Sequence, residues 1–404
     1  MKNRSRALAS FSLLLFLFSG CSEDVKESSS VAVSVPGASS AAMIVEGFRE
    51  PDRLARTENL ISLLRAVPAD QTDVFGEALS RMNFPNRELD RVLITTEWAK
   101  RDPVAATKWA KSHERSEIVR SAMYGDAIYY WALKDPESFL ADMEMALSIV
   151  PGFDASALRG FVRGWFDSGQ PGLEGFIRDM RSQSKDQQRA IDTLAKVRAE
   201  RHGAGATIKW AEDLPGSDRF KSDLYPRVAA KVVVLDPQLV VEWCERVCDS
   251  EVGEKMPHMI AAAWARESGE GAMNFIAAQP NKIPVRTGAR AAYRQFLMAD
   301  SDRALAWMEE TTEEQRRGPV LQGPVGMYLN KRSAQKEPLV AIEWLDYLQN
   351  EEERDGGRIM VLRRWLRHDP VAAEAWMAES SMSEEAKVEA RRSTAPGAKK
   401  RLEG

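Results

Sequence analysis

Three arginines have a spacing that could bind an anionic ligand. Arg286, Arg290 and Arg294 are four residues apart, so on a helix they share one face. Like charges at this spacing repel one another and weaken the helix unless other groups oppose them. A second basic pair, Arg316 and Arg317, follows in the chain. We predict that these five residues bind an acidic protein segment or an acidic glycan. The alternative, which charge runs of this kind favour, is a solvated face that neighbouring glutamates neutralise.

The second basic pair precedes an irregular stretch. Gly318-Pro319 and Gly323-Pro324 follow it within seven residues. Two Gly-Pro pairs are not expected to continue a helix, so the sequence predicts an inserted loop here. Loops inserted on a regular scaffold often carry binding residues.

No catalytic signature is present in the sequence. None of the four histidines has another His or a Cys three or four residues away, as a helical zinc site requires. Gly-x-Ser-x-Gly and phosphate-loop motifs are also absent. We therefore expect no catalytic residue, no metal site, no cofactor and no enzymatic activity. Cys244 and Cys248 lie four apart near an apolar stripe, and we expect free thiols there. The histidines are His113, His202, His258 and His368.

Cys21 could carry a different chemistry. A basic start is followed by an apolar run over residues 7–18 and by Phe18-Ser19-Gly20-Cys21. The run is too short to span a membrane and is typical of a secretory signal. Its ending resembles the signal of bacterial lipoproteins, in which this cysteine is acylated and becomes the mature N-terminus. The resemblance implies a lipid anchor on Cys21, and Ser22 implies the outer membrane, facing the periplasm. A cleaved secretory peptide and an uncleaved anchor are the alternatives.

The remainder of the chain is organised by a repeat. Asp102-Pro103-Val104-Ala105-Ala106-Thr107-Lys108-Trp109 returns as Asp369-Pro370-Val371-Ala372-Ala373-Glu374-Ala375-Trp376. Degraded versions connect the two copies at intervals of 32 to 37 residues, which predicts a repeat array because one such unit cannot bury its apolar face alone. The nine versions start at residues 102, 135, 170, 203, 236, 268, 300, 337 and 369.

The chemistry of this motif predicts where each helix ends. Asp accepts the free N–H groups of a first helical turn, and Pro fits the first helical position. The residue before Pro is pushed out of the helical region, so the preceding helix stops there. Each Asp-Pro should therefore end one helix and start the next.

All 11 tryptophans fall in two columns of the repeat, either seven residues after its start or four to five before it. A small residue precedes many of them by three positions, as Ala106 precedes Trp109. On a helix such pairs share a face and let neighbouring helices interlock. An aromatic binding platform is one interpretation, but helical spacing favours a buried core.

The Asp-Pro-x5-Trp spacing and the repeat length resemble the tetratricopeptide family. The sequence departs from that family after the tryptophan, since Ala-Lys-Ser-His follows Trp109 where Leu-Gly is expected. A HEAT-like or other helical-hairpin array is the alternative. The resemblance implies a curved superhelix that binds peptides or proteins.

We thus predict an all-α, right-handed α-solenoid of about nine helical hairpins with capping helices at both ends. The expected parts are a lipoprotein signal (1–21), a flexible tether (22–48), a helical cap or worn repeat (49–97), the array (98–380) and a C-terminal cap and tail (381–404).

The charge balance narrows the function. The formal net charge of −4 and the pI near 5.8 argue against a nucleic-acid binder. We predict a membrane-anchored envelope scaffold that binds a protein or peptide partner. A carbohydrate-binding protein or enzyme that uses a concave face is the alternative, and a structural spacer is a third.

Overall fold

The computed structural model describes residues 40–82, 88–113, 116–147 and 154–392, without side chains for 143–147. In these ranges the chain forms 22 α-helices and one short 3-10 helix, and no strand, which confirms the predicted all-α class. The helices up to residue 213 are α1 (Ser40–Gly47), α2 (Arg53–Ala66), α3 (Asp73–Arg81), α4 (Glu88–Arg101), α5 (Pro103–His113), α6 (Glu117–Lys134), α7 (Pro136–Leu147), α8 (Ala155–Ser168), α9 (Leu173–Asp179) and α10 (Lys185–Asp213).

The later helices continue the same alternation. They are α11 (Asp218–Val232), α12 (Pro237–Val247), α13 (Met256–Trp264), α14 (Gly269–Ala277), α15 (Ile283–Ala299), α16 (Ser301–Glu310), α17 (Glu313–Arg317), α18 (Gln322–Ala334), α19 (Pro338–Glu343), the 3-10 helix η1 (Trp344–Tyr347), α20 (Glu351–His368), α21 (Pro370–Glu379) and α22 (Glu384–Arg391).

The junction residue of the repeat ends one helix and caps the next, as its chemistry predicts. Asp135, Asp236, Asp300 and Asp369 each donate their N–H to the carbonyl four residues back, at 2.8–3.0 Å. Each carboxylate accepts the N–H three residues on, at 2.9–3.0 Å. Their backbone angles agree closely, with φ from −155° to −144° and ψ from 82° to 93°. One local geometry therefore sets the turn at these four junctions, whereas Glu337 has φ −109° and ψ 62° and makes no side-chain cap.

Gly203 makes the equivalent break without a carboxylate. Its φ of 80° and ψ of 175° interrupt α10, so the helix that follows begins at the repeat start. Thr207 donates its hydroxyl to the Gly203 carbonyl at 2.8 Å. Glycine suits this position because a side chain disfavours a positive φ.

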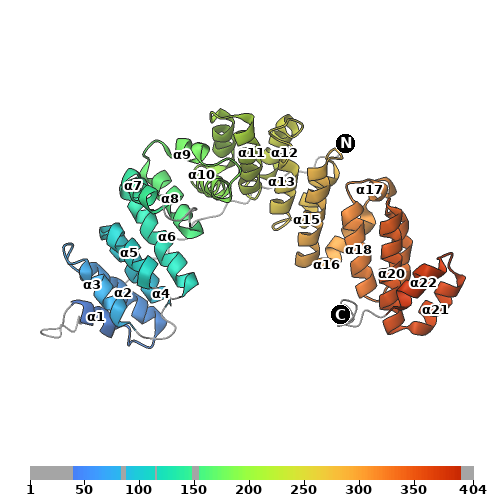
Figure 1. Cartoon of the computed structure of the whole chain (residues 1–404), viewed down its shortest axis with the longest axis horizontal. Helices are drawn as coiled ribbons and strands as arrows, with labels where there is room; N and C mark the ends of the chain where they lie inside the picture. The colour runs from blue at the N-terminus through green and yellow to red at the C-terminus, as the bar shows by residue number, and fades with distance from the viewer. Residues whose placement is uncertain (1–39, 83–87, 114–115, 148–153, 393–404) are drawn as a thin grey trace, which may run out of the picture.

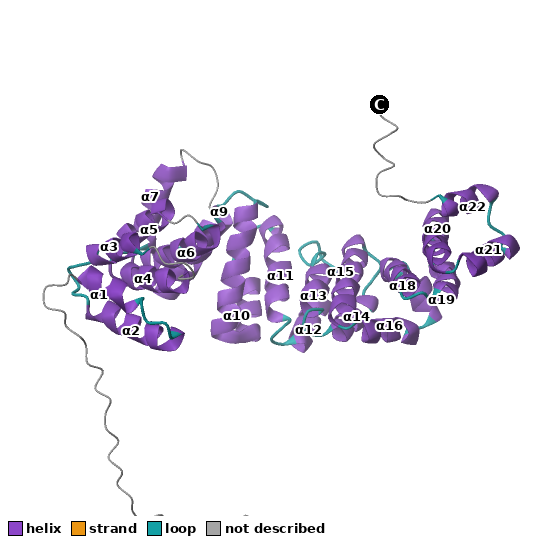
Figure 2. Cartoon of the chain, turned by 90° about the horizontal axis from the view of Figure 1, so that it is seen from below, coloured by secondary structure: helices purple, strands orange, loops and turns teal. Residues whose placement is uncertain are grey.

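The second helix of each unit packs on the second helix of the next. Figure 1 shows the units following one another in chain order along an arc. Figure 2 shows α12, α14 and α16 along one side of a row that contains α13, α15 and α18. The arrangement is helical and repeat-like, compatible with the predicted solenoid. We call the series α4, α6, α8, α10, α11, α13, α15, α18, α20 and α22 the second-helix layer.

The tryptophans form the core, as predicted. All 11 lie in the described residues, none is exposed and six are buried. Trp243 is fully buried and contacts the ring of Tyr225, while the Trp307 indole N–H bonds the Asn274 side chain at 2.8 Å. Because the helical spacing puts them between neighbouring units, the tryptophans hold the repeats together.

The closest helix pair, α6 and α8, packs backbone against backbone. A Cβ atom placed on Gly160 would lie 2.1 Å from the carbonyl oxygen of Gly125. One on Gly164 would lie 2.2 Å from the carbonyl oxygen of Tyr129. Both distances are far below van der Waals contact, so only glycine fits at these two positions.

The N-terminal end of the fold lies earlier than the sequence predicts. Residues 40–47, expected to end the flexible tether, form α1, and this helix packs on α2 and α3. Ala41, Ile44 and Phe48 are almost completely buried there. The signal, Cys21 and most of the tether lie outside the described residues. At the other end α22 packs on α20, and Arg391 pairs with Glu374 of α21 at 2.6 Å.

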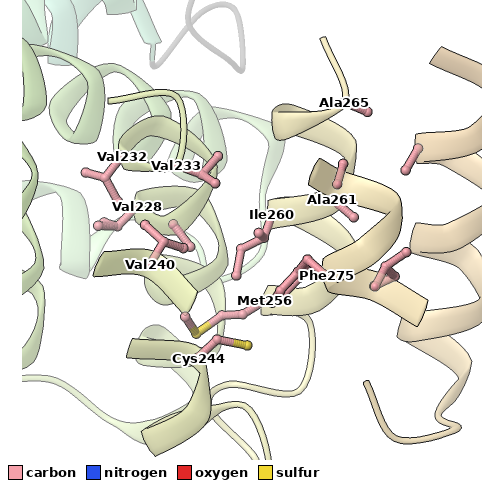
Figure 3. Packing of buried hydrophobic residues seen from close by; sticks show 14 of the residues in the cluster. Val228, Val232, Val233, Val240, Cys244, Met256, Ile260, Ala261, Ala265 and Phe275 are labelled. Carbon is pink, nitrogen blue, oxygen red and sulfur yellow. The ribbon is translucent and has the colours of Figure 1, made fainter. Parts of the chain in front are cut away.

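Cys244 and Cys248 form a disulfide, where the sequence favours free thiols. The last turn of α12 brings their Cα atoms to 4.8 Å, within the range that a disulfide spans. The bridge lies in the core between α11, α12 and α13, and Figure 3 shows Cys244 there with Val240 and Met256. The expectation of free thiols is therefore wrong.

Candidate functional site

The three arginines of α15 form one exposed stripe. Val285, Ala289 and Phe296 on the opposite face of α15 are buried against neighbouring helices, which turns Arg286, Arg290 and Arg294 outward. In the part of the chain that the structure describes, no hydrogen bond or ion pair engages these three guanidinium groups. We refer to Arg286, Arg290 and Arg294 as the α15 arginine stripe.

The electrostatics of the stripe do not favour the helix. Each of the two i, i+4 pairs of like charge costs about 0.2–0.5 kcal/mol. Arg286 also lies in the first turn of α15, where the helix dipole disfavours a cation. The nearby Lys282 illustrates the contrast, since its ammonium group pairs with Asp249 at 2.9 Å. The predicted neutralisation of the stripe by neighbouring glutamates is not seen among the described residues.

Arg316 and Arg317 are engaged within the chain. The Arg316 guanidinium lies 4.6 Å from the ring centre of Trp344 and hydrogen-bonds the Tyr347 hydroxyl at 3.3 Å. Arg317 pairs with Glu313 at 3.0 Å. The Arg316 contacts, and the hydrogen bond from Arg317 to the Asp346 carbonyl at 3.2 Å, attach α17 to η1 of the following unit, so we leave both arginines out of the ligand surface proposed below.

The expected loop beside them is mostly helical. Residues 313–317 form α17, whose first turn is closed by a capping box between Thr312 and Gln315. The second Gly-Pro pair, Gly323-Pro324, lies in the first turn of α18, where proline is tolerated. Only residues 318–321 stay outside a helix, and Leu321 is buried.

A groove of about 310 Å³ opens on the second-helix layer beside the stripe. Its apolar walls come from three helices: Pro226 of α11, Met259 of α13, and Ile283 and Pro284 of α15. Ile283 is 70% exposed, which is unusual for a large apolar side chain. The polar lining is Ser222, Asp223, Arg227, Lys255, His258 and Thr287. We call this the α11–α13–α15 groove.

Two polar groups in the groove wall lack partners. Asp223 is only 7% exposed, and its Oδ2 accepts no hydrogen bond from any residue that the structure describes. His258 has a buried Nδ1 with no partner, and burial lowers the pKa of this imidazole. Arg227, one turn beyond Asp223, pairs instead with Asp192 at 2.6 Å. Buried polar groups without partners are rare and often mark a place where a ligand or water binds.

The groove and the stripe occupy equivalent repeat positions. Pro226, His258 and Arg290 are 32 residues apart, each ten before the start of the next unit. They therefore follow one another across α11, α13 and α15, which pack side by side (Figures 1 and 2). Sequence analysis missed the groove, although this 32-residue column and the apolar Ile283 beside the arginines were visible signals.

A second groove, of about 530 Å³, lies between the α18–α19 turn and α20–α21. Trp365 and Leu339 line it together with His368 and Lys336. The buried hydroxyl of Ser333 in its wall has no hydrogen-bond partner. This groove is a separate surface from the α15 arginine stripe.

The other candidate residues have structural surroundings. His113 stacks on Trp109 with ring centres 5.1 Å apart, and His202 lies edge-on to Phe166 at 5.8 Å. In the described ranges, no three His, Cys, Asp or Glu side chains gather in a way that could hold a metal ion. No helix of that part of the chain is long and apolar enough to cross a membrane.

Comparison with protein-family models, with curated proteins and with solved structures finds no match for this chain.

Proposed function

We propose that this protein is a membrane-anchored envelope scaffold whose helical repeats bind an acidic segment of a partner protein on the α15 arginine stripe. The observation that carries the proposal is that the three guanidinium groups are exposed and have no ion pair or hydrogen bond within the described part of the chain. The stripe costs helix stability, and among the described residues no ion pair or hydrogen bond of its guanidinium groups offsets this cost, which is expected of a surface kept for a ligand. Acidic partners complement such a surface and are steered toward it.

The anchoring part of the proposal rests on the sequence. The resemblance of Phe18-Ser19-Gly20-Cys21 to lipoprotein signals supports a lipid on Cys21 and a location at the outer membrane, facing the periplasm. The Cys244–Cys248 disulfide is in keeping with this, because disulfides persist in oxidising compartments such as the periplasm. The resemblance to tetratricopeptide arrays likewise supports protein binding. The enzymatic or carbohydrate-binding alternative and the spacer stay predictions.

Affinity capture from an envelope extract tests the binding function. The bait is the full chain in detergent, compared with a double variant that carries Arg290→Glu and Arg294→Glu. Arg53→Glu is the matched control, since Arg53 is exposed at the start of α2, in the N-terminal cap. A protein that the wild type and the control recover, and the double variant does not, supports the proposal. Recovery of the same proteins by all three baits contradicts it.

Membrane fractionation tests the anchor separately. Replacement of Cys21 with alanine removes the atom that would carry the lipid. We expect the variant to leave the membrane fraction. If Cys21→Ala stays with the membrane, the lipid assignment is refuted while the binding function is untouched.

A further inference from the structure

The groove and the stripe lie on one face of α15. Ile283, in the groove wall, and Arg290 are seven residues apart, which is two helical turns, so both side chains point the same way. At a rise of about 1.5 Å per residue, Ile283 is about 10 Å from Arg290 and about 16 Å from Arg294 along the helix axis. One bound segment can therefore touch both features.

An extended chain covers these distances in a few residues. At about 3.3 Å per residue, 10 to 16 Å corresponds to about three to five residues. The groove volume of about 310 Å³ is at the lower end of pockets that hold small apolar groups. A peptide also has a backbone N–H donor at every residue except proline. Such a donor could bond Oδ2 of Asp223, which has no partner among the described residues.

The charged residues around the groove determine whether an acidic or a basic segment binds. Lys255 at the groove rim is exposed and, within the described residues, its ammonium group has no ion pair or hydrogen bond, as is true of the guanidinium groups of the stripe. Arg227 in the wall is held by Asp192 and does not pair with Asp223, so the positive charge of this surface comes from Lys255 and the stripe. An acidic segment is favoured over a basic one at this surface.

We propose that the α11–α13–α15 groove and the α15 arginine stripe bind one extended acidic segment of a partner protein together. An apolar side chain of the segment enters the groove, between Met259 and Ile283. Carboxylates three to five residues away pair with Arg290 and Arg294. This inference rests on the proposed function and adds a recognition motif to it. The motif is an apolar anchor with acidic residues about three to five positions before or after it.

Labelled synthetic peptides test the motif against the full chain by fluorescence anisotropy. The probe places a Leu pair and a Glu pair at the two ends of a three-residue Ser/Gly spacer, and it is made in both orders. One comparison peptide has Ser in place of Leu, and another has Lys in place of Glu. The protein variants are Ile283→Ser for the groove and Arg290→Glu with Arg294→Glu for the stripe. Val371→Ser is the matched control for an exposed apolar residue, on α21.

The inference predicts that one order of the Leu–Glu probe binds and that Ser for Leu weakens binding about tenfold, as expected for a lost buried aliphatic side chain. Ile283→Ser should weaken binding, whereas Val371→Ser should not. If the probe binds through the arginines but is insensitive to both Ser replacements, the groove anchor is refuted and the proposed function stands. If the variant with Arg290→Glu and Arg294→Glu binds the probe as tightly as the wild type does, both the recognition motif and the proposed function are refuted. If neither order binds, the motif is refuted, and the capture experiment alone decides the proposed function.

Discussion

Replacement of Arg290 by glutamate should stabilise the fold and abolish ligand binding at the same time. Arg290 is the middle residue of the stripe, so it takes part in both like-charge pairs, with Arg286 and with Arg294. The variant turns two repulsive i, i+4 pairs into two attractive ones, and each change is about 0.4–1 kcal/mol. The side-chain stem of Arg290 packs near Gly323 of α18, and glutamate keeps two of its three carbons. The net gain is therefore about 1 kcal/mol.

Urea unfolding followed by circular dichroism measures this change. The midpoint of Arg290→Glu should lie above that of the wild type at low salt, and the difference should shrink in about 1 M salt because exposed charges are screened. Arg53→Glu, away from the stripe, is the control. A lower midpoint for Arg290→Glu would mean that the arginine supports the fold. A stripe that supports the fold would not need a ligand to explain it, so the proposed binding function would be refuted.

Three further outcomes test the fold. Gly160→Ala should lower the melting temperature, because its Cβ would lie 2.1 Å from the Gly125 carbonyl oxygen and overpacking costs about 1–3 kcal/mol or more; wild-type stability would contradict this packing. Asp236→Ala should cost about 0.5–2 kcal/mol in urea unfolding by removing the cap on Leu239 N–H, and an unchanged midpoint would argue against the junction. Burial and the bond to Glu309 raise the pKa of Tyr328 to about 12, so its contribution to stability is complete below pH 10 and is lost as the pH rises through about 12. Tyrosinate absorbance should show an ionisation near pH 12 that is absent from the Tyr328→Phe variant. Titration of Tyr328 near pH 10 in the folded chain would contradict this prediction.

The sequence predicts the helix junctions well because their causes are local. The Asp carboxylate accepts the backbone N–H three residues later, and the Pro fits the first helical turn. Neither residue needs a partner that is distant in the sequence. The uniform geometry of Asp135, Asp236 and Asp369 follows from that chemistry. The tryptophan core was predictable for a related reason, since helical spacing alone aligns the two columns on one face.

Features that depend on distant residues could not be predicted. Residues 40–47 show no repeat motif, and α1 is fixed by burial of Ile44 and Phe48 against α2 and α3. The role of Arg316 depends on Trp344, which comes 28 residues later in a different unit. The disulfide joins residues only four apart, but it requires the Cα distance of 4.8 Å that the last turn of α12 sets, and the spacing alone did not show this distance.

In the candidate site, too, only the feature that is local in the sequence was predictable. Spacing alone identified the stripe, because its members lie on one helix. The groove required the structure, because Asp223, His258 and Ile283 come from three helices and meet only when the units stack. That the stripe lacks ion pairs also depended on the positions of carboxylates in neighbouring units.

Site-specific photo-crosslinking in intact cells shows whether a partner protein occupies the groove and the stripe. A photoreactive residue at Thr287, between the groove and the stripe, is compared with one at Val371 on α21. The account predicts a crosslinked protein at position 287 that is absent at position 371 and disappears when Arg290 and Arg294 are reversed to glutamate. The same crosslink in the charge-reversed chain, or none at position 287, would contradict it.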